Sequence, residues 1–408
     1  MRKRYSLAHC LAGAMAARAG DEMSGPALML TGFALAGSTT DASSLLAAIT
    51  ISAAVGGPVL GALLDRAGRP GRLLAGALFL YAAGLATILL GLGRLPFPVT
   101  LLTAVLTGLM GPALSGGWTA QLPRVVPIER LPRANALDAM TFSGASLAGP
   151  ALAGVLAETL GSPTAVVCSV ALIASALPAA WLLPAGRGRA RGVKRSSALS
   201  DLAGGIRVDL SAGIRVIVRR PPLARATLTS VVSCVAQGML LACIPMLGER
   251  VLGGAGRGAV LLSCTAVSAL VANALLARFP GAVAPDTVIW ASALVQAAAL
   301  ALAASGRPVM LVLAVVMLGI GEGPQLTALF AVRHREAPEH LRSQIFTTGA
   351  SLKITAFAVG AAVAGPVAVR SLPVALLLAA SVAAAAALAC LAIPATTVDP
   401  AEDRAQAN

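Results

Sequence analysis

The sequence predicts an all-α integral membrane protein whose twelve transmembrane helices form two pseudo-symmetric bundles of six. Three observations support this fold class. Of the 408 residues, 57% are hydrophobic and only 12% are charged, whereas a soluble domain carries about 25% charged residues. Apolar stretches of about twenty residues, long enough to cross a bilayer, recur along the whole chain. Finally, the two halves of the sequence resemble each other.

Twelve apolar stretches are predicted to cross the bilayer. They lie at residues 7–36, 43–64, 73–92, 97–119, 136–158, 163–184, 224–247, 258–277, 283–304, 309–331, 345–367 and 372–394. The first could instead be a cleaved signal peptide, since basic residues precede it. We expect it to be retained, because three charged residues interrupt it and eleven spans would break the symmetry of the halves.

Four segments follow from these spans. They are an N-terminal six-helix bundle at 1–184, a basic linker at 185–223, a C-terminal six-helix bundle at 224–394 and a tail at 395–408. Within the linker, apolar residues from Leu199 to Ile217 recur at steps of three and four. This spacing predicts an amphipathic helix on the membrane surface.

The similarity between the halves is clearest in two stretches. "MGPALSGGWTAQLPRVVPIERLPR" (110–133) resembles "EGPQLTALFAVRHREAPEHLR" (322–342), with Pro127 aligned to Pro338. Further on, Gly149-Pro150 aligns with Gly365-Pro366. Shared Ala-, Gly- and Pro-rich composition is the alternative explanation, but the loop charges recur as well. Duplicated bundles around a central path are the plan of many transporters.

The basic residues predict the orientation of the chain. If both termini are cytoplasmic, 24 of the 31 Lys and Arg residues lie in cytoplasmic segments and five lie outside. Lys and Arg concentrate in cytoplasmic loops of membrane proteins. We therefore expect a multi-pass protein of the plasma membrane with both termini in the cytoplasm.

A motif in the loop between the second and third spans indicates a family. "GALLDRAGRPGR" (61–72) resembles the Gly-x-x-x-Asp-Arg-x-Gly-Arg loop signature of the major facilitator superfamily. The resemblance in span number, central linker and duplicated halves covers nearly the whole chain. It implies a transporter that works by alternating access. It also implies that Asp65 binds the start of span 11 in the opposite bundle.

The motif residues have readable physical roles. Gly61 allows two helices to approach closely, and Gly68 is expected to form a tight turn at a positive φ. Asp65 can interact with the positive end of another helix. Arg66 and Arg69 are expected to hold the loop at anionic lipid head groups, although they could serve only as topogenic charges.

Span 5 carries a degenerate form of another family feature. Antiporter-type members have a Gly-rich signature on this span, and Gly149 and Pro150 match its core. Pro150 removes a helix hydrogen bond and Gly149 permits close packing, so the span can bend there. The match favours export by antiport, although simple helix packing explains it equally well. A family Arg in the middle of span 4 is missing.

Charged residues within spans are costly and are usually functional. Arg18, Asp21 and Glu22 lie near the middle of span 1, where Arg18 is expected to reach both acids at i+3 and i+4. One acid would then remain to bind a proton or a cationic substrate. The pattern resembles the first span of bacterial drug and siderophore exporters. A buried pair that only fixes packing is the alternative.

Three further residues are candidates for the central path. Glu322 lies near the middle of span 10 and is a second candidate proton site. Gln237 on span 7 and Gln325 on span 10 are candidate substrate donors, since spans 1, 4, 7 and 10 line the cavity in this family. Either Gln could instead form a hydrogen bond between helices.

Other chemistry is sparse. Three His and six Cys show no metal-ligand spacing, and no Gly-Lys-Ser/Thr phosphate loop is present. We therefore expect no cofactor, no metal and no enzyme activity. We also expect no nucleic-acid partner, because the basic residues lie between apolar spans and no folded basic domain is available to present them. The expected partners are a small-molecule substrate, protons and membrane lipids, and the expected state is a monomer.

These observations together predict proton-coupled efflux of a small, partly hydrophobic compound such as a drug, secondary metabolite or siderophore. Two alternatives stay open. One is a major facilitator importer of a small metabolite, against which the low aromatic content argues in the case of sugars. The other is a transporter-like receptor that senses a ligand without moving it.

Overall fold

The computed structural model describes residues 6–36, 39–185, 212–254 and 258–393, and within these ranges the chain is helical with no strand. The long helices are α1 (Leu7–Ala36), α2 (Thr39–Arg66), α3 (Pro70–Gly91), α4 (Phe97–Gly108), α6 (Leu131–Leu160), α7 (Ser162–Trp181), α9 (Pro221–Leu252), α10 (Gly258–Arg278), α11 (Pro285–Ala303), α12 (Pro308–Glu336), α13 (Arg342–Arg370) and α14 (Leu372–Ala392). Short elements are the π-helix η1 (Ala113–Gly117), α5 (Leu122–Val125), η2 (Ile128–Arg130) and η4 (Glu339–Leu341).

The twelve predicted spans correspond to these long helices, which confirms the predicted fold class. Among the residues that the structure describes, eleven segments are long and apolar enough to cross a membrane, and α4 together with η1 forms one of them. The twelfth, α1, has 30 residues but includes Arg18, Asp21 and Glu22. These charges lower the hydropathy of its central turns, so α1 is recognised by its position in the bundle.

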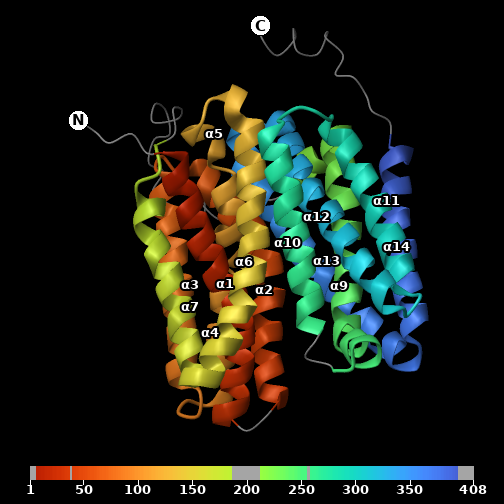
Figure 1. Ribbon diagram of the computed structural model, residues 1–408. Coiled ribbons are helices and arrows are strands. Elements are labelled where there is room, and N and C mark those ends of the chain that lie inside the picture. The colour runs from red at the N-terminus through yellow and green to blue at the C-terminus, as the bar shows by residue number, and fades with distance from the viewer. Residues whose placement is uncertain (1–5, 37–38, 186–211, 255–257, 394–408) are drawn as a thin grey trace, which may run out of the picture.

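The helices form two bundles side by side (Figure 1). One apolar core contains only side chains from the first half, between Cys10 and Leu183, and two others contain only side chains of the second half, between Ile217 and Cys390. The predicted repeat is visible at one detail of the backbone. Pro127 and Pro338 each precede a single 3-10 turn, η2 or η4, which leads directly into α6 or α13.

The two bundles contact each other most closely at one end of the molecule. We call it the α5 end, after the short helix that lies there; α1 begins and α14 ends at the same end (Figure 1). Among the described residues, six pairs form hydrogen bonds across the bundles: Asp65 with Ser343, Asp65 with Gln344, Gln121 with Ser343, Gly57 with Thr347, Ala53 with Ser351, and Thr119 with His334. The structure is therefore closed at the α5 end.

The end of span 10 differs from the sequence prediction. Span 10 was expected to end at residue 331, but α12 continues to Glu336 and buries Arg333 and His334. Packing against α13 and the other bundle supplies the burial that hydropathy could not indicate. The predicted amphipathic helix of the linker falls largely at 186–211, outside the described residues, and residues 212–219 are helical.

Candidate functional site

A cavity of about 600 Å³ lies between the two bundles. Its wall begins at the level of Arg18 and Phe346 and continues away from the α5 end toward Met29 and Phe357. The lining side chains are mostly apolar or aromatic. Five charged groups interrupt this surface: Arg18, Asp21 and Glu22 on α1, Arg333 on α12 and Lys353 on α13. A cavity with apolar walls and few polar groups is typical of sites for small organic molecules.

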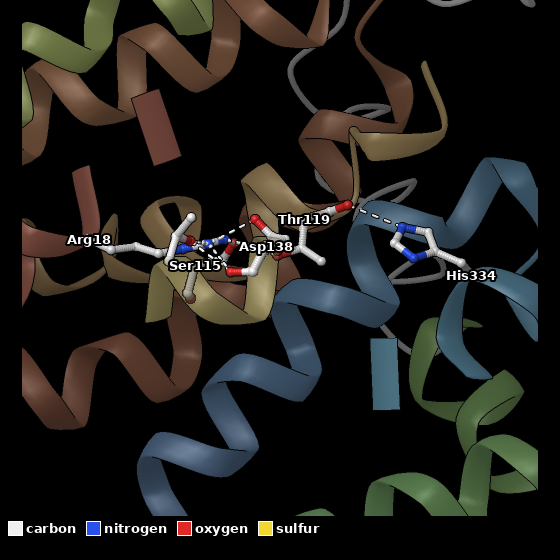
Figure 2. Close-up of polar contacts among 6 residues, drawn as sticks. Arg18, Ser115, Thr119, Asp138 and His334 are labelled. Atoms are coloured by element: carbon white, nitrogen blue, oxygen red, sulfur yellow. Dashed lines mark hydrogen bonds and ion pairs between the residues drawn. The ribbon is translucent and has the colours of Figure 1, made fainter. Parts of the chain in front are cut away.

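Arg18 does not pair with the acids on its own helix, so this prediction was wrong. Its Nη1 atom lies 2.8 Å from Oδ1 of Asp138 on α6, and both side chains are almost fully buried. Nη2 donates to the hydroxyl of Thr119 at 3.0 Å, and Nη1 also contacts the hydroxyl of Thr141. Figure 2 shows the guanidinium directed into this polar cluster. The ring of Phe142 stacks beneath it, 3.6 Å from the Cζ atom.

Asp138 is a residue that the sequence analysis missed. It is 1% exposed and lies two residues inside the predicted span at 136–158, which was a readable signal of an intramembrane carboxylate. Its Oδ2 atom also accepts a hydrogen bond from Thr119 at 2.7 Å. Since Arg18 and Asp138 neutralise each other, neither is left to bind a substrate charge.

Both acids of α1 face the cavity and have only neutral partners. Oδ1 of Asp21 accepts a 2.6 Å hydrogen bond from the hydroxyl of Tyr81 on α3. Oε1 of Glu22 accepts one from Ser146 on α6 at 3.2 Å. The helices come this close because Gly149 of α6 has no side chain where a Cβ atom would meet Glu22 and Met23. The predicted role of Gly149 in close packing is confirmed; Pro150 lies inside an uninterrupted α6.

The candidates of the second half lie outside the lining of this cavity. Gln237, Gln296 and Gln325 form a chain, with Nε2 of Gln237 donating to Gln296 and Nε2 of Gln296 donating to Gln325, both at 3.1 Å. Gln325 also donates to Ser233 at 3.1 Å. These bonds link α9, α11 and α12. Gln237 and Gln325 therefore form hydrogen bonds between helices, which was the alternative to their prediction as substrate donors. Glu322 is half-buried, and the charge of Lys353 acts on it.

Two cationic residues of the cavity were not singled out as site residues. The predicted span at 309–331 ends before Arg333, and Lys353 lies inside the predicted span at 345–367. In the structure Arg333 is 2% exposed, and both side chains line the cavity. The position of Arg333 one turn after Phe330, in a helix that continues past its apolar stretch, explains the burial.

The loop motif has the contact that the family resemblance implies. Oδ1 of Asp65 accepts from the backbone N–H of Ser343 at 2.8 Å, and Oδ2 accepts from that of Gln344 at 2.9 Å. These two N–H groups belong to the first turn of α13, where helical hydrogen-bond partners are absent. A carboxylate is favoured there because the helix dipole is positive at this end.

The two motif glycines behave differently. A Cβ atom on Gly61 would collide with Cα of Gln344 and with Thr347, so only glycine permits this approach of α2 to α13. Gly68 has no atom within 4 Å of its would-be Cβ atom, and its φ angle is not positive. The predicted positive-φ turn at Gly68 was wrong, because the backbone between α2 and α3 bends without it. Arg66 and Arg69 are exposed.

A histidine extends the polar cluster across the bundles. Nε2 of His334 on α12 lies 3.1 Å from the carbonyl oxygen of Thr119, the residue whose hydroxyl contacts both Arg18 and Asp138 (Figure 2). The ring also packs against Phe346 in a tilted arrangement, with centroids 4.5 Å apart and ring planes at 41°. The buried ion pair of the first bundle is thereby connected to α12 of the second.

A family model described as Major Facilitator Superfamily matches residues 10–348. The chain belongs to the major facilitator superfamily. A curated relative from Sinorhizobium fredii (strain NBRC 101917 / NGR234), an uncharacterised MFS-type transporter, is 30% identical over 351 residues, which cover 83% of this chain and 82% of that protein. Family and fold therefore indicate a multi-pass membrane transporter rather than an enzyme.

Several solved major facilitator structures share the fold. The human organic anion transporter MFSD10 (TETRAN) is 15% identical with a TM-score of 0.78, covering 96% of this chain and 100% of that chain. A bacterial homologue of the iron transporter ferroportin in an outward-facing state is 14% identical with a TM-score of 0.75, covering 94% and 98%. The E. coli fucose:proton symporter is 17% identical with a TM-score of 0.69, covering 97% and 100%.

Proposed function

We propose that this major facilitator protein exports a small, partly hydrophobic compound in exchange for protons. The observation that carries the proposal is the position of Asp21 and Glu22 on the wall of the central cavity. Each acid is held by a hydroxyl, from Tyr81 or Ser146, and not by a cation. A hydroxyl can remain bonded to a carboxyl group whether or not that group is protonated. These acids can therefore take up and release a proton without breaking an ion pair.

Alternating access supplies the cycle. With the orientation predicted from the basic residues, the closed α5 end faces the cytoplasm, and the structure represents an outward-facing state. The two proposed bundles, 1–184 and 224–394, would rock about the cavity so that the acids face each side in turn. Protons would bind on the outside after the substrate leaves, the protonated carrier would return without substrate, and the protons would be released on the inside before the next substrate is carried out.

Arg18 has an indirect part in this proposal. Because Asp138 neutralises it, it does not hold Asp21 or Glu22 in the charged form through a direct ion pair. It instead fixes α1 against α6 one turn away from both acids. Gln237 and Gln325 stay proposed as substrate donors only in a state in which their mutual chain with Gln296 opens.

Import and sensing are the competing functions. The fold does not decide the direction of transport, since its structural relatives include the E. coli fucose:proton symporter. An importer would accumulate substrate against the direction proposed here. A receptor would bind ligand in the same cavity and show no flux at all.

The test uses inverted membrane vesicles with an imposed, acid-inside pH gradient. A panel of small amphiphilic compounds is added, and loss of the gradient is followed with a pH-sensitive dye. Compounds that are exported should dissipate the gradient in wild-type vesicles. Asp21→Asn and Glu22→Gln should abolish gradient-driven flux but keep passive substrate exchange, because the cavity itself is unchanged.

Glu129→Gln serves as the matched control, because Glu129 is exposed in η2 and does not line the cavity. Glu322→Gln is measured alongside, as the second predicted proton site. Wild-type flux in Asp21→Asn, Glu22→Gln and Glu322→Gln would refute the proton-site assignment. Ligand binding without flux in the wild type would favour the receptor.

A further inference from the structure

We propose that the α12–α13 wall of the cavity binds the anionic group of an amphiphilic organic anion, with Arg333 as its principal ligand and Lys353 beside it. The inference rests on the proposed function in one respect, namely that substrates occupy this cavity. It adds the chemical class of the substrate, which neither the family nor the proton sites specify.

Arg333 has a buried charge without a counter-ion. The side chain is 2% exposed, and it makes no hydrogen bond or ion pair within the described part of the chain. Its Nε and Nη2 atoms are enclosed and lack an acceptor. The guanidinium packs against Gly349, where a Cβ atom would collide with it, and lies 5.7 Å from the ring centroid of Phe346. A buried cation without acceptors is costly unless a ligand supplies them.

Arg18 on the opposite wall provides the comparison within the same cavity. Its guanidinium forms an ion pair with Asp138 at 2.8 Å and donates hydrogen bonds to two hydroxyl groups and to a carbonyl oxygen at 3.2 Å. Both arginines touch the lining. Arg18 leaves only its Nε atom without an acceptor, whereas no nitrogen of the Arg333 guanidinium has a hydrogen-bond partner among the described residues. A guanidinium binds carboxylates and related anions through two parallel hydrogen bonds, which defines the expected group.

The apolar lining specifies the rest of the ligand. Phe142, Phe330 and Phe346 form a continuous series, with neighbouring ring centroids 5.7 and 5.9 Å apart. The series connects Arg18 at one end with Arg333 at the other. An inorganic anion would leave this surface in contact with water, whereas an aromatic or aliphatic body would cover it. We therefore infer an organic anion rather than a small mineral one.

The other charged residues of the cavity determine how such a ligand is oriented in it. Asp21 and Glu22 are on the α1 wall and repel an anion toward α12 and α13. Lys353 lines the same side as Arg333 but is only partly buried, whereas Arg333 is 2% exposed. Because solvent screens a partly exposed charge more strongly, Arg333 should contribute more to anion affinity.

The experiment measures ligand-induced thermal stabilisation of the purified full chain in detergent, with no pH gradient. The probes are three apolar bodies (2-naphthyl, 4-biphenylyl and octyl), each bearing a carboxylate, an alcohol or a primary ammonium group. The carboxylates should stabilise the wild type at the lowest concentrations. In Arg333→Gln their apparent affinity should fall by about tenfold to a hundredfold, as expected for loss of charge-assisted hydrogen bonds, while the alcohols change little.

Arg335→Gln is the matched control, because Arg335 lies two residues away, is 47% exposed and pairs with Asp286. Gly349→Ala, which displaces the guanidinium, should weaken the carboxylates in the same selective manner. Equal loss for carboxylates and alcohols, or tighter binding of the ammonium or alcohol series in the wild type, would overturn the anion site. Because binding needs no gradient, this result is independent of whether protons drive transport.

Discussion

At the scale of single residues, Arg18 and Arg333 are both buried inside the membrane protein, but their surroundings differ. The two terminal nitrogens of Arg18 pair with a carboxylate and hydroxyls, and only its Nε atom lacks an acceptor, whereas Arg333 lines the cavity without a hydrogen-bond partner among the described residues. The first arrangement is structural and the second suits a ligand. Burial alone is the same for both side chains, 2% exposed in each case, so partners and not burial separate the two roles.

The structural role of the first pair can be tested by removing its negative member. Asp138→Asn leaves the buried Arg18 guanidinium without a counter-charge, which should cost about 3–5 kcal/mol of the free energy of unfolding. The measurement is equilibrium unfolding of the purified protein in mixed SDS and mild-detergent micelles. Arg18→Gln/Asp138→Asn should lose less than the sum of the single variants.

The exposed pair of Arg335 and Asp286 is the control for this cycle, since its members are 47% and 35% exposed and such pairs contribute only about 0–1 kcal/mol. Strict additivity of the Arg18 and Asp138 variants would show that the two residues do not stabilise the bundle through each other.

The same pair shows what local spacing can and cannot reveal. The cost of charges within a span correctly marked Arg18, Asp21 and Glu22 as unusual. Their spacing then suggested mutual pairing, but Asp138 lies 120 residues away on α6. A partner brought by tertiary packing cannot be read from the i+3 and i+4 positions of one helix. Both α1 acids face the cavity beside hydroxyls instead.

At the scale of elements, the contact between α2 and α13 depends on the absence of side chains. Gly57 and Gly61 lie against Thr347, Ser351 and Gln344, where Cβ atoms would not fit. Thr347 and Ser351 then donate to the backbone carbonyls of Gly57 and Ala53, each at 2.6 Å. This close approach holds the α5 end shut. Its geometry is set by glycines on one helix and hydroxyls on the other.

Gly61→Ala should therefore open the α5 end. The added methyl group would overlap Gln344 and Thr347, and overpacking of this kind costs about 1–3 kcal/mol. States in which α2 and α13 are apart would escape that cost and become more populated. The measurement is the distance distribution between spin labels at Arg69→Cys and Glu339→Cys, both exposed positions, in a background without the native cysteines.

Gly68→Ala tests the specificity of this effect. It lies in the same motif, yet its would-be Cβ atom has no neighbour within 4 Å and its backbone is ordinary. Its distance distribution should match that of the wild type. An unchanged distribution in Gly61→Ala would mean that the contact does not control closure.

Hydropathy predicted the long helices well because crossing a bilayer requires about twenty apolar residues, whatever they pack against. Hydropathy did not predict those helix ends whose positions depend on packing against other helices. The extension of α12 through Arg333 and His334 depends on α13 and on the carbonyl oxygen of Thr119. α4 ends at Gly108, and η1 begins at Ala113, shortly after Gly111. The sequence did not predict that η1 would be a π-helix. Element ends therefore follow tertiary contacts, while element existence follows composition.

At the scale of the whole molecule, the chain combines an internal repeat with an unequal distribution of charge. The two 3-10 turns before α6 and α13 preserve the repeat. The cavity walls do not preserve it, since the acids Asp21 and Glu22 lie on α1 while Arg333 and Lys353 lie on α12 and α13. The repeat is therefore kept in the backbone, whereas the acidic and basic side chains of the cavity lie on opposite walls.

The proposed direction of transport depends on which side of the membrane the α5 end faces. The preference of Lys and Arg for cytoplasmic loops places Arg130 and Glu339, at the α5 end, in the cytoplasm, and Arg94 and Arg307, at the opposite end, outside. All four side chains are exposed. Single cysteines at positions 94 and 307 should therefore react with a membrane-impermeant maleimide in intact cells. Cysteines at 130 and 339 should react only after permeabilisation. The reverse pattern would make this structure inward-facing, and labelling of positions 94 and 130 from the same side would contradict the number of spans between them.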